Sequence, residues 1–400
     1  MNAWNRRVMT LAPFALIAAL LATSLHAWEE PEPWKAEMRD LLSADREGVG
    51  QAQAAAAYDR IVAAGLPALS PLLHSAKEAN PIALQWILAA ADRILADAAT
   101  RGKPLPREEL TAFVMDRSQR DKARFLAWDW LRRIDAASAR RIVEDMLDDP
   151  AGPLRREAVE LRLADLPDAT AIRAAASDDA RRTAWREALS ALFRAARDRD
   201  QVRRITDRLQ ALGESPDLVG HYGYVRSWYV VGPFDNTSDT GFDRPFPPEE
   251  RPGTPDLSAS YSGKHGAVTW REYVSTDENG LIDLNAAVGE EKGVLAYAVA
   301  RVISDAARTA QIRVSTPNSF KLWVNGEEAA SYHVYHSGFE PDQYTIPCRL
   351  NQGENVIFVK VCQNEQTQEW AKPWAFYLRV CDSLGGGVIR GESDTAEQHP

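Results

Sequence analysis

The stretch Trp228-Tyr-Val-Val-Gly-Pro-Phe-Asp-Asn236 divides the chain into two patterns of apolar residues. Apolar side chains recur at helical spacing before it and alternate along short runs after it, which is typical of β-strands. Gly232 tolerates unusual dihedral angles and Pro233 has no N–H for a strand ladder, so we expect a strand that ends at this pair. The sequence therefore predicts a helical part followed by a strand-rich part.

The first residues have the pattern of an export signal. Arg6 and Arg7 precede an apolar run from Leu11 to Leu21, and the chain turns polar after Ala27. We expect a signal peptide over residues 1–27, cleavage after Ala27, and a periplasmic or secreted protein with no membrane span after cleavage. Leu25 is larger than the residue that a cleavage site prefers at this position, so an uncleaved membrane anchor is the alternative. The paired arginines leave Sec and twin-arginine export both open.

The length of 400 residues favours two domains, and charge follows the same division. We expect a helical repeat domain over residues 28–219, a β-sandwich over 220–386 and a disordered tail over 387–400 that begins within Gly385-Gly-Gly387. From Gly220 onward, 15 Lys and Arg stand against 24 Asp and Glu. An excess of acid argues against nucleic acid as a partner.

The helical part contains stripes of apolar residues that each cover one helix face, such as Trp185, Leu189 and Leu192. A helix pair with one stripe per helix cannot bury itself alone, which predicts stacked pairs in a short α-solenoid. The segment Asp148-Asp-Pro-Ala-Gly-Pro-Leu-Arg-Arg-Glu-Ala-Val159 resembles HEAT repeats. The resemblance implies a scaffold that contacts a protein partner. A compact helical bundle with no binding face is the alternative.

The strand-rich part predicts an antiparallel sandwich of about ten strands, without a helix between them. Residues 308–315 alternate cleanly between apolar and polar. Phe320, Leu322 and Val324 repeat the pattern before Asn325-Gly326, a pair that accepts positive φ at both positions and predicts a tight hairpin.

Several motifs of this part resemble galactose-binding-like jelly-roll domains. They are Trp228 to Asn236, Gly241-Phe-Asp243, Lys321-Leu-Trp-Val-Asn-Gly-Glu327 and Leu350-x-x-Gly-x-Asn-Val356. Such domains accompany secreted bacterial glycoside hydrolases and also follow HEAT repeats in secreted proteins of unassigned role. The resemblance implies an α+β multidomain protein, with a HEAT-like α-solenoid followed by an antiparallel jelly roll. The motifs specify turns and strand starts and do not themselves show a bound sugar.

A sugar site needs an aromatic face with hydrogen-bonding side chains beside it. The residues that offer this mixture near predicted loops are Tyr332, His333, Tyr335, His336, Asp342, Trp370 and Trp374. In an extended segment His333 and Tyr335 point one way, and Tyr332 and His336 the other. We predict a ligand surface here, and the alternative is that these aromatics seal the edge of the sandwich or its contact with the helices.

The sequence also offers oxygen ligands and three cysteines. Asp235, Asn236, Asp239 and Asp243 form an oxygen-rich loop, and related jelly rolls hold a structural calcium, but the spacing does not match an EF-hand loop. We expect turn-capping carboxylates there and predict no cofactor. The three cysteines, Cys348, Cys362 and Cys381, favour buried free thiols, while one bridge between any two of them stays open.

The sequence contains none of the common hydrolase or phosphate-binding motifs. A glycosidase needs only two carboxylates at a suitable separation, and Asp243, Glu249, Glu250 and Asp342 are available without a spacing that favours any pair. We therefore expect a non-catalytic binding or scaffold protein, whose helices contact protein and whose sandwich contacts carbohydrate or protein. A carbohydrate-active enzyme and a purely structural envelope component are the alternatives.

Overall fold

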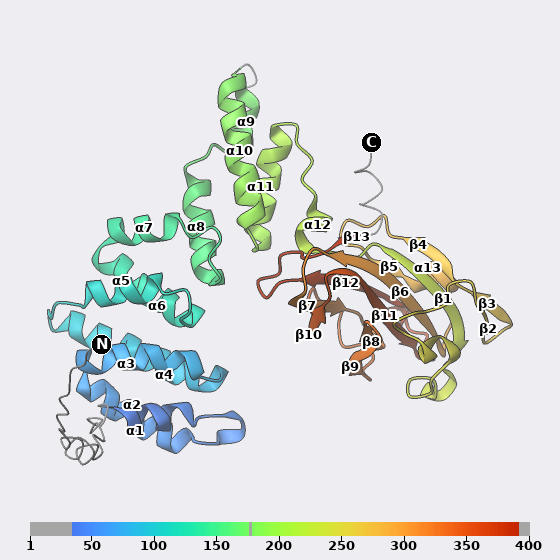
Figure 1. The fold of residues 1–400 in the computed structure, drawn as a ribbon, viewed down its shortest axis with the longest axis horizontal. Helices are drawn as coiled ribbons and strands as arrows, with labels where there is room; N and C mark the ends of the chain where they lie inside the picture. Colours follow the sequence, from blue (N-terminus) through green and yellow to red (C-terminus); the bar gives the residue numbers. More distant parts are fainter. Residues whose placement is uncertain (1–33, 176–177, 392–400) are drawn as a thin grey trace, which may run out of the picture. The chain divides into compact units, whose positions relative to one another are not determined.

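The structure is a computed structural model that describes residues 34–175 and 178–391 (Figure 1). The chain divides into two compact units between Ala139 and Arg140, each of which is described by itself. The predicted signal peptide and the last nine residues of the predicted tail lie outside the described residues. No helix in the described part combines the length and the apolar character that crossing a bilayer requires.

The first unit is helical. Its α-helices are α1 (Lys35–Leu42), α2 (Gln51–Ala64), α3 (Leu69–Ser75), α4 (Pro81–Thr100), α5 (Arg107–Met115) and α6 (Asp121–Ile134), and α7 (Ala136–Glu144) crosses into the second unit. Asn80 begins α4, because its side chain accepts the N–H groups of Ile82 and Ala83 at 2.8 and 2.9 Å. The Trp130 indole N–H donates to Asp92 at 2.8 Å and fixes α6 against α4.

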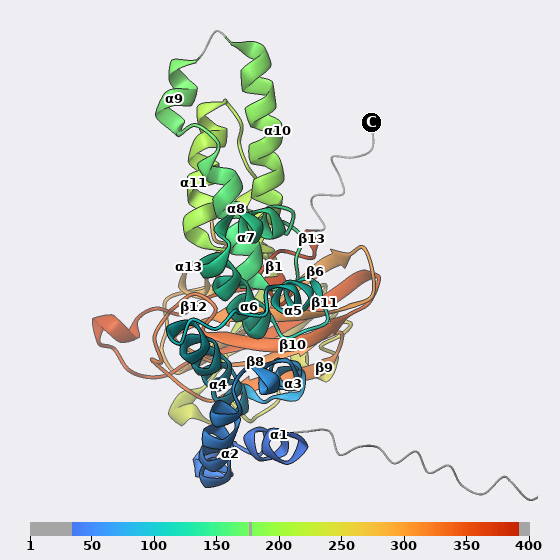
Figure 2. The same cartoon turned by 90° about the vertical axis from the view of Figure 1, so that its left-hand side faces the viewer.

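The α-helices of the second unit that lie between α7 and the first strand are α8 (Gly152–Ala164), α9 (Ala169–Ala174), α10 (Asp179–Ala195), α11 (Arg199–Ala211) and α12 (Leu218–Tyr222). Figure 2 shows α9, α10 and α11 as neighbours. Leu189 and Leu192 of the predicted stripe pack with Val202 and Ile205 of α11, which confirms the stripe. The HEAT-repeat interpretation of these helices stays a prediction.

The strand-rich part contains two main antiparallel sheets. The larger sheet has the order β4-β1-β6-β11-β8-β9 and contains β1 (Ser227–Asp235), β4 (Arg271–Val274), β6 (Val294–Ser304), β8 (Ser319–Val324), β9 (Glu327–Tyr332) and β11 (Gly353–Gln363), with β13 (Arg390–Gly391) beside β6. The smaller sheet has the order β10-β7-β12-β5 and contains β5 (Ile282–Asp283), β7 (Arg308–Ser315), β10 (Tyr344–Leu350) and β12 (Ala375–Cys381). The short strands β2 (Ser260–Ser262) and β3 (Ala267–Thr269) form a ribbon. The α+β fold class with an antiparallel sandwich is confirmed.

Two apolar clusters hold the sandwich together. The inner cluster lies between the sheets and includes Trp228, Ile312, Ile357 and Phe376. A second cluster lies on the other face of the large sheet. It is rich in aromatic rings, which are Phe234, Phe242, Phe246, Trp270, Tyr297, Trp323 and Phe358. Strand β11 is buried almost throughout because it has apolar neighbours on both faces, as its continuous apolar sequence indicates.

The structure corrects the predicted end of the first strand. Strand β1 continues through Gly232 and Pro233 to Asp235, and the pairing with β6 shifts register between Val231 and Phe234. Proline is accepted there because a residue within a register shift need not donate to the ladder. Glycine is needed because an added Cβ would lie 3.0 Å from the Cβ of Ala296.

Local turn chemistry decides three further predictions. The Asn325-Gly326 hairpin between β8 and β9 is confirmed, with φ of 52° and 90°. The expectation of no helix among the strands is wrong, since α13 (Leu284–Val288) follows Asp283, whose carboxylate caps its first turn. The glycine segment is folded rather than disordered up to residue 391: the Gly387 N–H donates to the His221 carbonyl at 2.8 Å, and an added Cβ would lie 2.2 Å from the Gly220 oxygen.

Candidate functional site

Three loops meet at one end of the sandwich. They follow β1, β9 and β11, and the strand register brings their starting points together, because Asp235 and Gln363 both pair with Val294. Asn236 ties the loops to one another: its Nδ2 donates to the Gln363 carbonyl at 3.2 Å and to the Tyr335 hydroxyl at 3.1 Å. We call this surface, formed by residues 236–243, 333–343 and 364–370, the loop end.

Asp239 organises one half of the loop end. Its carboxylate accepts the Tyr335 hydroxyl at 2.6 Å and a hydrogen bond from His333 Nε2. The His333 ring stacks on Phe242 with 4.1 Å between ring centroids. Burial, together with the hydrogen bond to Asp239, raises the pKa of Tyr335, so the phenol stays neutral and donates. His333 remains half exposed, which leaves one edge of this cluster open to a ligand.

Trp370 dominates the other half. The indole is 59% exposed, and its ring meets the edge of His336 with 4.7 Å between centroids. Asn364 Nδ2 donates to His336 Nε2 at 3.1 Å, which fixes the imidazole beneath the indole. The segment 364–370 reads Asn-Glu-Gln-Thr-Gln-Glu-Trp, so amide and carboxylate groups surround the exposed ring. An exposed indole among hydrogen-bonding side chains is the combination that a sugar site requires.

The backbone of the loop end is held in uncommon conformations. In the described part of the chain, seven residues other than glycine have positive φ, and four of them are Ser238, Asp239, His336 and Asp342. Such conformations are less stable and persist where the surroundings fix them, as they often do at binding sites. Glu365 supplies one such fixing contact, since its carboxylate accepts the Ser238 N–H.

The structure brings four of the predicted ligand residues to this surface. His333 and Tyr335 lie on one side, as the alternation predicted, because both contact Asp239. His336 and Trp370 lie together on the other side. Tyr332 is half buried and stacks on Phe320 and Tyr344 at the margin of the inner core, so it supports the loop from below.

Asp342 and Trp374 are placed differently from the prediction. Asp342 accepts from Arg379 Nε at 2.6 Å and from Arg313 Nη1 at 3.0 Å. Burial acts to raise the pKa of Asp342, but these hydrogen bonds and charges outweigh it and lower the pKa. Trp374 is fully buried and donates to the Val361 carbonyl at 3.3 Å, so it is a core residue and offers no surface to a ligand.

Sequence reasoning missed Asp239 as the centre of the site and missed Asn364 altogether. Asp239 is 94 residues from His333, and nothing local connects them. The strand register is the signal that could have predicted this contact, because it places the ends of β1, β9 and β11 at the same end of the large sheet.

The carboxylates considered for catalysis pair with different cations. Glu249 lies 2.6 Å from the buried Lys360 ammonium and accepts the Tyr297 hydroxyl at 2.5 Å. Asp243 lies 3.2 Å from Lys321, and Asp342 pairs with the two arginines described above. Burial, followed by the charge of Glu249, raises the pKa of Tyr297. Each of these three acids therefore serves an ion pair, and the lysine partners of Asp243 and Glu249 face each other on neighbouring strands.

The oxygen-rich loop shows the expected turn chemistry. Asp235 accepts the Thr237 hydroxyl at 2.6 Å and its N–H at 3.3 Å, and the Asn236 oxygen accepts the Gly241 N–H at 2.9 Å. Within residues 34–175 and 178–391, no three His, Cys, Asp or Glu side chains gather in a way that could hold a metal ion.

All three cysteines are free thiols in the structure. Burial raises the pKa of Cys348 to about 11 and that of Cys362 to about 12, and it also raises the pKa of Cys381. Thiols of this kind are poor nucleophiles at neutral pH.

The structure was compared with known proteins, and a solved structure resembles part of it. No family model matches the chain, and no curated protein matches it. Part of the chain is similar to the native structure of a family 35 carbohydrate binding module from Clostridium thermocellum, at 20% identity and a TM-score of 0.17. The likeness covers 22% of this chain and 72% of that one.

Proposed function

We propose that this protein is an exported, non-catalytic binding protein whose sandwich binds carbohydrate at the loop end. The observation that carries the proposal is the Trp370 indole, 59% exposed beside His336 and Asn364. A large aromatic face left open to water favours a partner that covers it. The C–H face of a pyranose is such a partner, because it stacks on an indole while its hydroxyls reach the surrounding polar groups.

The polar groups around Trp370 suit hydroxyls. Gln366 and Gln368 are exposed, and each amide supplies both donors and an acceptor. The open edge of His333 beside Asp239 adds a second polar contact on the same surface. This mixture of amides and a few charges favours a neutral or weakly charged sugar.

The loop end is also organised before any ligand arrives. Asn236, Asp239 and Glu365 connect the loops through hydrogen bonds, and the positive φ residues Ser238 and Asp239 lie within this network. Loops fixed in advance lose less conformational entropy when a ligand binds. This arrangement supports a binding role, because less of the stacking energy is lost in ordering the loops and more of it contributes to affinity.

The test is a glycan array followed by isothermal titration with the full chain. Trp370→Ala should weaken binding of any glycan found by at least about tenfold, because it removes the stacking surface. Tyr229→Ala is the matched control, since Tyr229 is 36% exposed on β1 and is no part of the loop end. The absence of any glycan, together with measurable polysaccharide hydrolysis, would overturn the proposal.

We further propose that the helical part contacts a protein. The support is the resemblance of residues 148–159 to HEAT repeats, because stacked repeats commonly present an extended binding surface. A pull-down with the full chain, repeated after removal of glycans, measures this contact separately from sugar binding. Capture that depends entirely on glycan would contradict a protein partner.

A further inference from the structure

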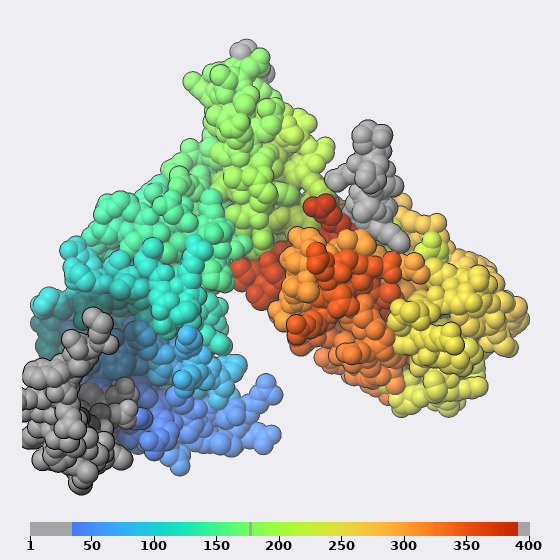
Figure 3. All heavy atoms as spheres, in the orientation of Figure 1, coloured from blue at the N-terminus to red at the C-terminus, as the bar shows by residue number. Residues whose placement is uncertain are grey.

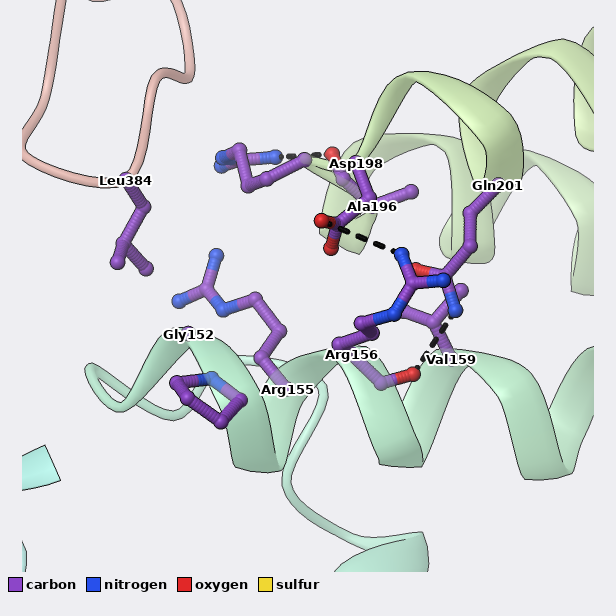
Figure 4. A pocket seen from close by; sticks show the side chains of 10 residues that line it. Gly152, Arg155, Arg156, Val159, Ala196, Asp198, Gln201 and Leu384 are labelled. Carbon is purple, nitrogen blue, oxygen red and sulfur yellow. Dashed lines mark hydrogen bonds and ion pairs between the residues drawn. The ribbon is translucent and has the colours of Figure 1, made fainter. Parts of the chain in front are cut away.

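A cavity of about 330 Å³ lies among the helices of the second unit. It is lined by the first turns of α8, by the connection between α10 and α11, by Gln201 of α11 and by Leu384 of the connection after β12 (Figure 4). The space-filling view shows this red connection against the green helices (Figure 3). The volume is within the usual range for one small ligand, about 300–1,000 Å³.

Arg155 supplies a free cationic group to the cavity. Its Nε donates to the Asp149 carbonyl at 2.9 Å, which fixes the guanidinium, while its two terminal nitrogens have no hydrogen-bond partner among the described residues. Figure 4 shows the guanidinium between Leu384 and the Ala196–Asp198 segment. Burial, followed by the charge of Arg197, lowers the pKa of Arg155. Arg155 and Arg197 line the same cavity.

Arg197 adds a second cation with an unused donor. Its Nη1 donates to the carbonyls of Arg194 and Ala196 at 2.7 and 2.8 Å, at the end of α10. Its Nε is buried and has no partner in the described part of the chain. The carboxylate of Asp382 lies 3.9 Å from Nη2, so the two groups form a long ion pair without a hydrogen bond.

Gln201 contributes an unused acceptor. The side chain is fully buried and lines the cavity, and Figure 4 shows it reaching from α11 toward α8. Its Nε2 donates to the Arg156 carbonyl at 2.9 Å, whereas its Oε1 is buried without any partner in the described residues. A buried acceptor without a donor is unfavourable by about 1–3 kcal/mol, so a ligand that donates to it gains affinity.

The charges around the cavity leave it favourable for an anion. Asp198 and Asp200 lie 3.2 and 2.8 Å from Arg156, so these three groups largely neutralise one another. The N-terminal residues of α8 and α11 also line the cavity or border it, and neither helix has a side-chain cap at its first turn. The first turn of α11 contains the carboxylate of Asp200, so only the N-terminus of α8 adds positive potential to that of Arg155 and Arg197.

We propose that this cavity binds a small hydroxy acid, with its carboxylate between Arg155 and Arg197 and a hydroxyl that donates to Gln201 Oε1. The ligand pairs with Arg155 and Arg197 and supplies the donor that Gln201 Oε1 lacks. A neutral sugar would leave Arg155 without an ion pair, and a simple anion without a hydroxyl would leave Gln201 unsatisfied. The site is separate from the loop end and does not depend on glycan binding there.

The test is isothermal titration of the full chain with D-galacturonate as the hydroxy acid, galactose as its neutral counterpart and acetate as the anion without a hydroxyl. Galacturonate should bind at least about tenfold more tightly than either. Arg155→Gln should weaken galacturonate at least about tenfold, and Arg155→Lys should recover part of the loss, which excludes misfolding as the cause. Gln201→Met should weaken galacturonate and leave acetate unchanged.

Two controls keep this site distinguishable from the loop end. Arg199→Gln carries the same charge change on an exposed arginine whose hydrogen bond goes to Tyr224, and it should leave galacturonate affinity unchanged. Trp370→Ala should also leave it unchanged. Equal affinity for galactose and galacturonate, or loss of galacturonate binding in Trp370→Ala, would overturn the proposal. Acetate that binds as tightly as galacturonate would overturn the role of Gln201.

Discussion

The sandwich contains two clusters built from the same kinds of group, with different consequences. Glu249, Tyr297 and Lys360 form one, in which a carboxylate accepts from a tyrosine and pairs with a cation out of contact with water. Asp239 makes the corresponding contacts with Tyr335 and His333 at the loop end, where the groups are half exposed. Burial therefore decides the role: the first cluster fixes a loop on the sheet, and the second leaves an edge for a ligand.

The largest expected effect follows from breaking the buried cluster. Glu249→Leu leaves the Lys360 ammonium, which is fully buried, without its counter-ion, and we expect a loss of about 3–5 kcal/mol in the free energy of unfolding. Denaturant unfolding followed by tryptophan fluorescence measures this. Adding Lys360→Met should restore part of the loss, because the unpaired charge is then removed. If the free energy of unfolding of Glu249→Leu were within about 1 kcal/mol of that of the original chain, a structural role for the Glu249–Lys360 pair would be contradicted.

Alkaline pH should weaken both clusters, because each tyrosine has a pKa above its ordinary value of about 10. Below pH 10 the folded and unfolded states both hold the proton, so stability is unaffected. Above pH 10 the unfolded state loses the proton first, and each tyrosine lowers the free energy of unfolding by about 1.4 kcal/mol per pH unit. Tyr297→Phe and Tyr335→Phe should each reduce this slope. A slope unchanged in both variants would contradict the burial of the phenols.

Asp239→Asn should have a smaller effect on stability than Glu249→Leu. The carboxylate is about one-third exposed, so water replaces part of the lost interaction, and we expect a loss of about 1 kcal/mol. Glycan affinity should fall in the same variant, because Tyr335 and His333 each donate to a different oxygen of Asp239 and asparagine offers only one. Parallel unfolding and titration experiments would check both. A loss as large as that of Glu249→Leu would show that the loop end is structural.

Trp370→Ala should have the smallest effect on stability, below about 0.5 kcal/mol, because the side chain is 59% exposed. Its effect should fall on binding alone. Thermal unfolding of the variant, measured without and with glycan, separates the two. A drop of several degrees in Tm without ligand would mean that Trp370 supports the fold.

The fold could be predicted further than the site, for a physical reason. Alternation along β7 and the Asn325-Gly326 turn depend on neighbours in the chain, and both predictions were confirmed. The path of β1 through Gly232 and Pro233 depends on close packing against Ala296 of another strand. Local sequence propensities carry no information about such a contact between distant residues.

The candidate site was predicted in part for the same reason. Alternation alone placed His333 and Tyr335 on one side, and the structure confirms this. Trp370 and Trp374 look equivalent in sequence, yet one is exposed and the other is in the core, because only Trp374 adjoins a buried strand, β12. Pairings such as Asp239 with His333 arise from topology and could not be derived from local patterns.

The two tryptophans also supply the most direct test of carbohydrate binding at the loop end. Indole N–H resonances of the full chain can be followed by ¹⁵N–¹H correlation spectra during glycan titration, with Trp370 assigned from Trp370→Phe. We predict that the Trp370 resonance moves with increasing glycan while that of the buried Trp374 stays in place. A Trp370 resonance that stays constant while glycan binding is complete would contradict a ligand surface at the loop end.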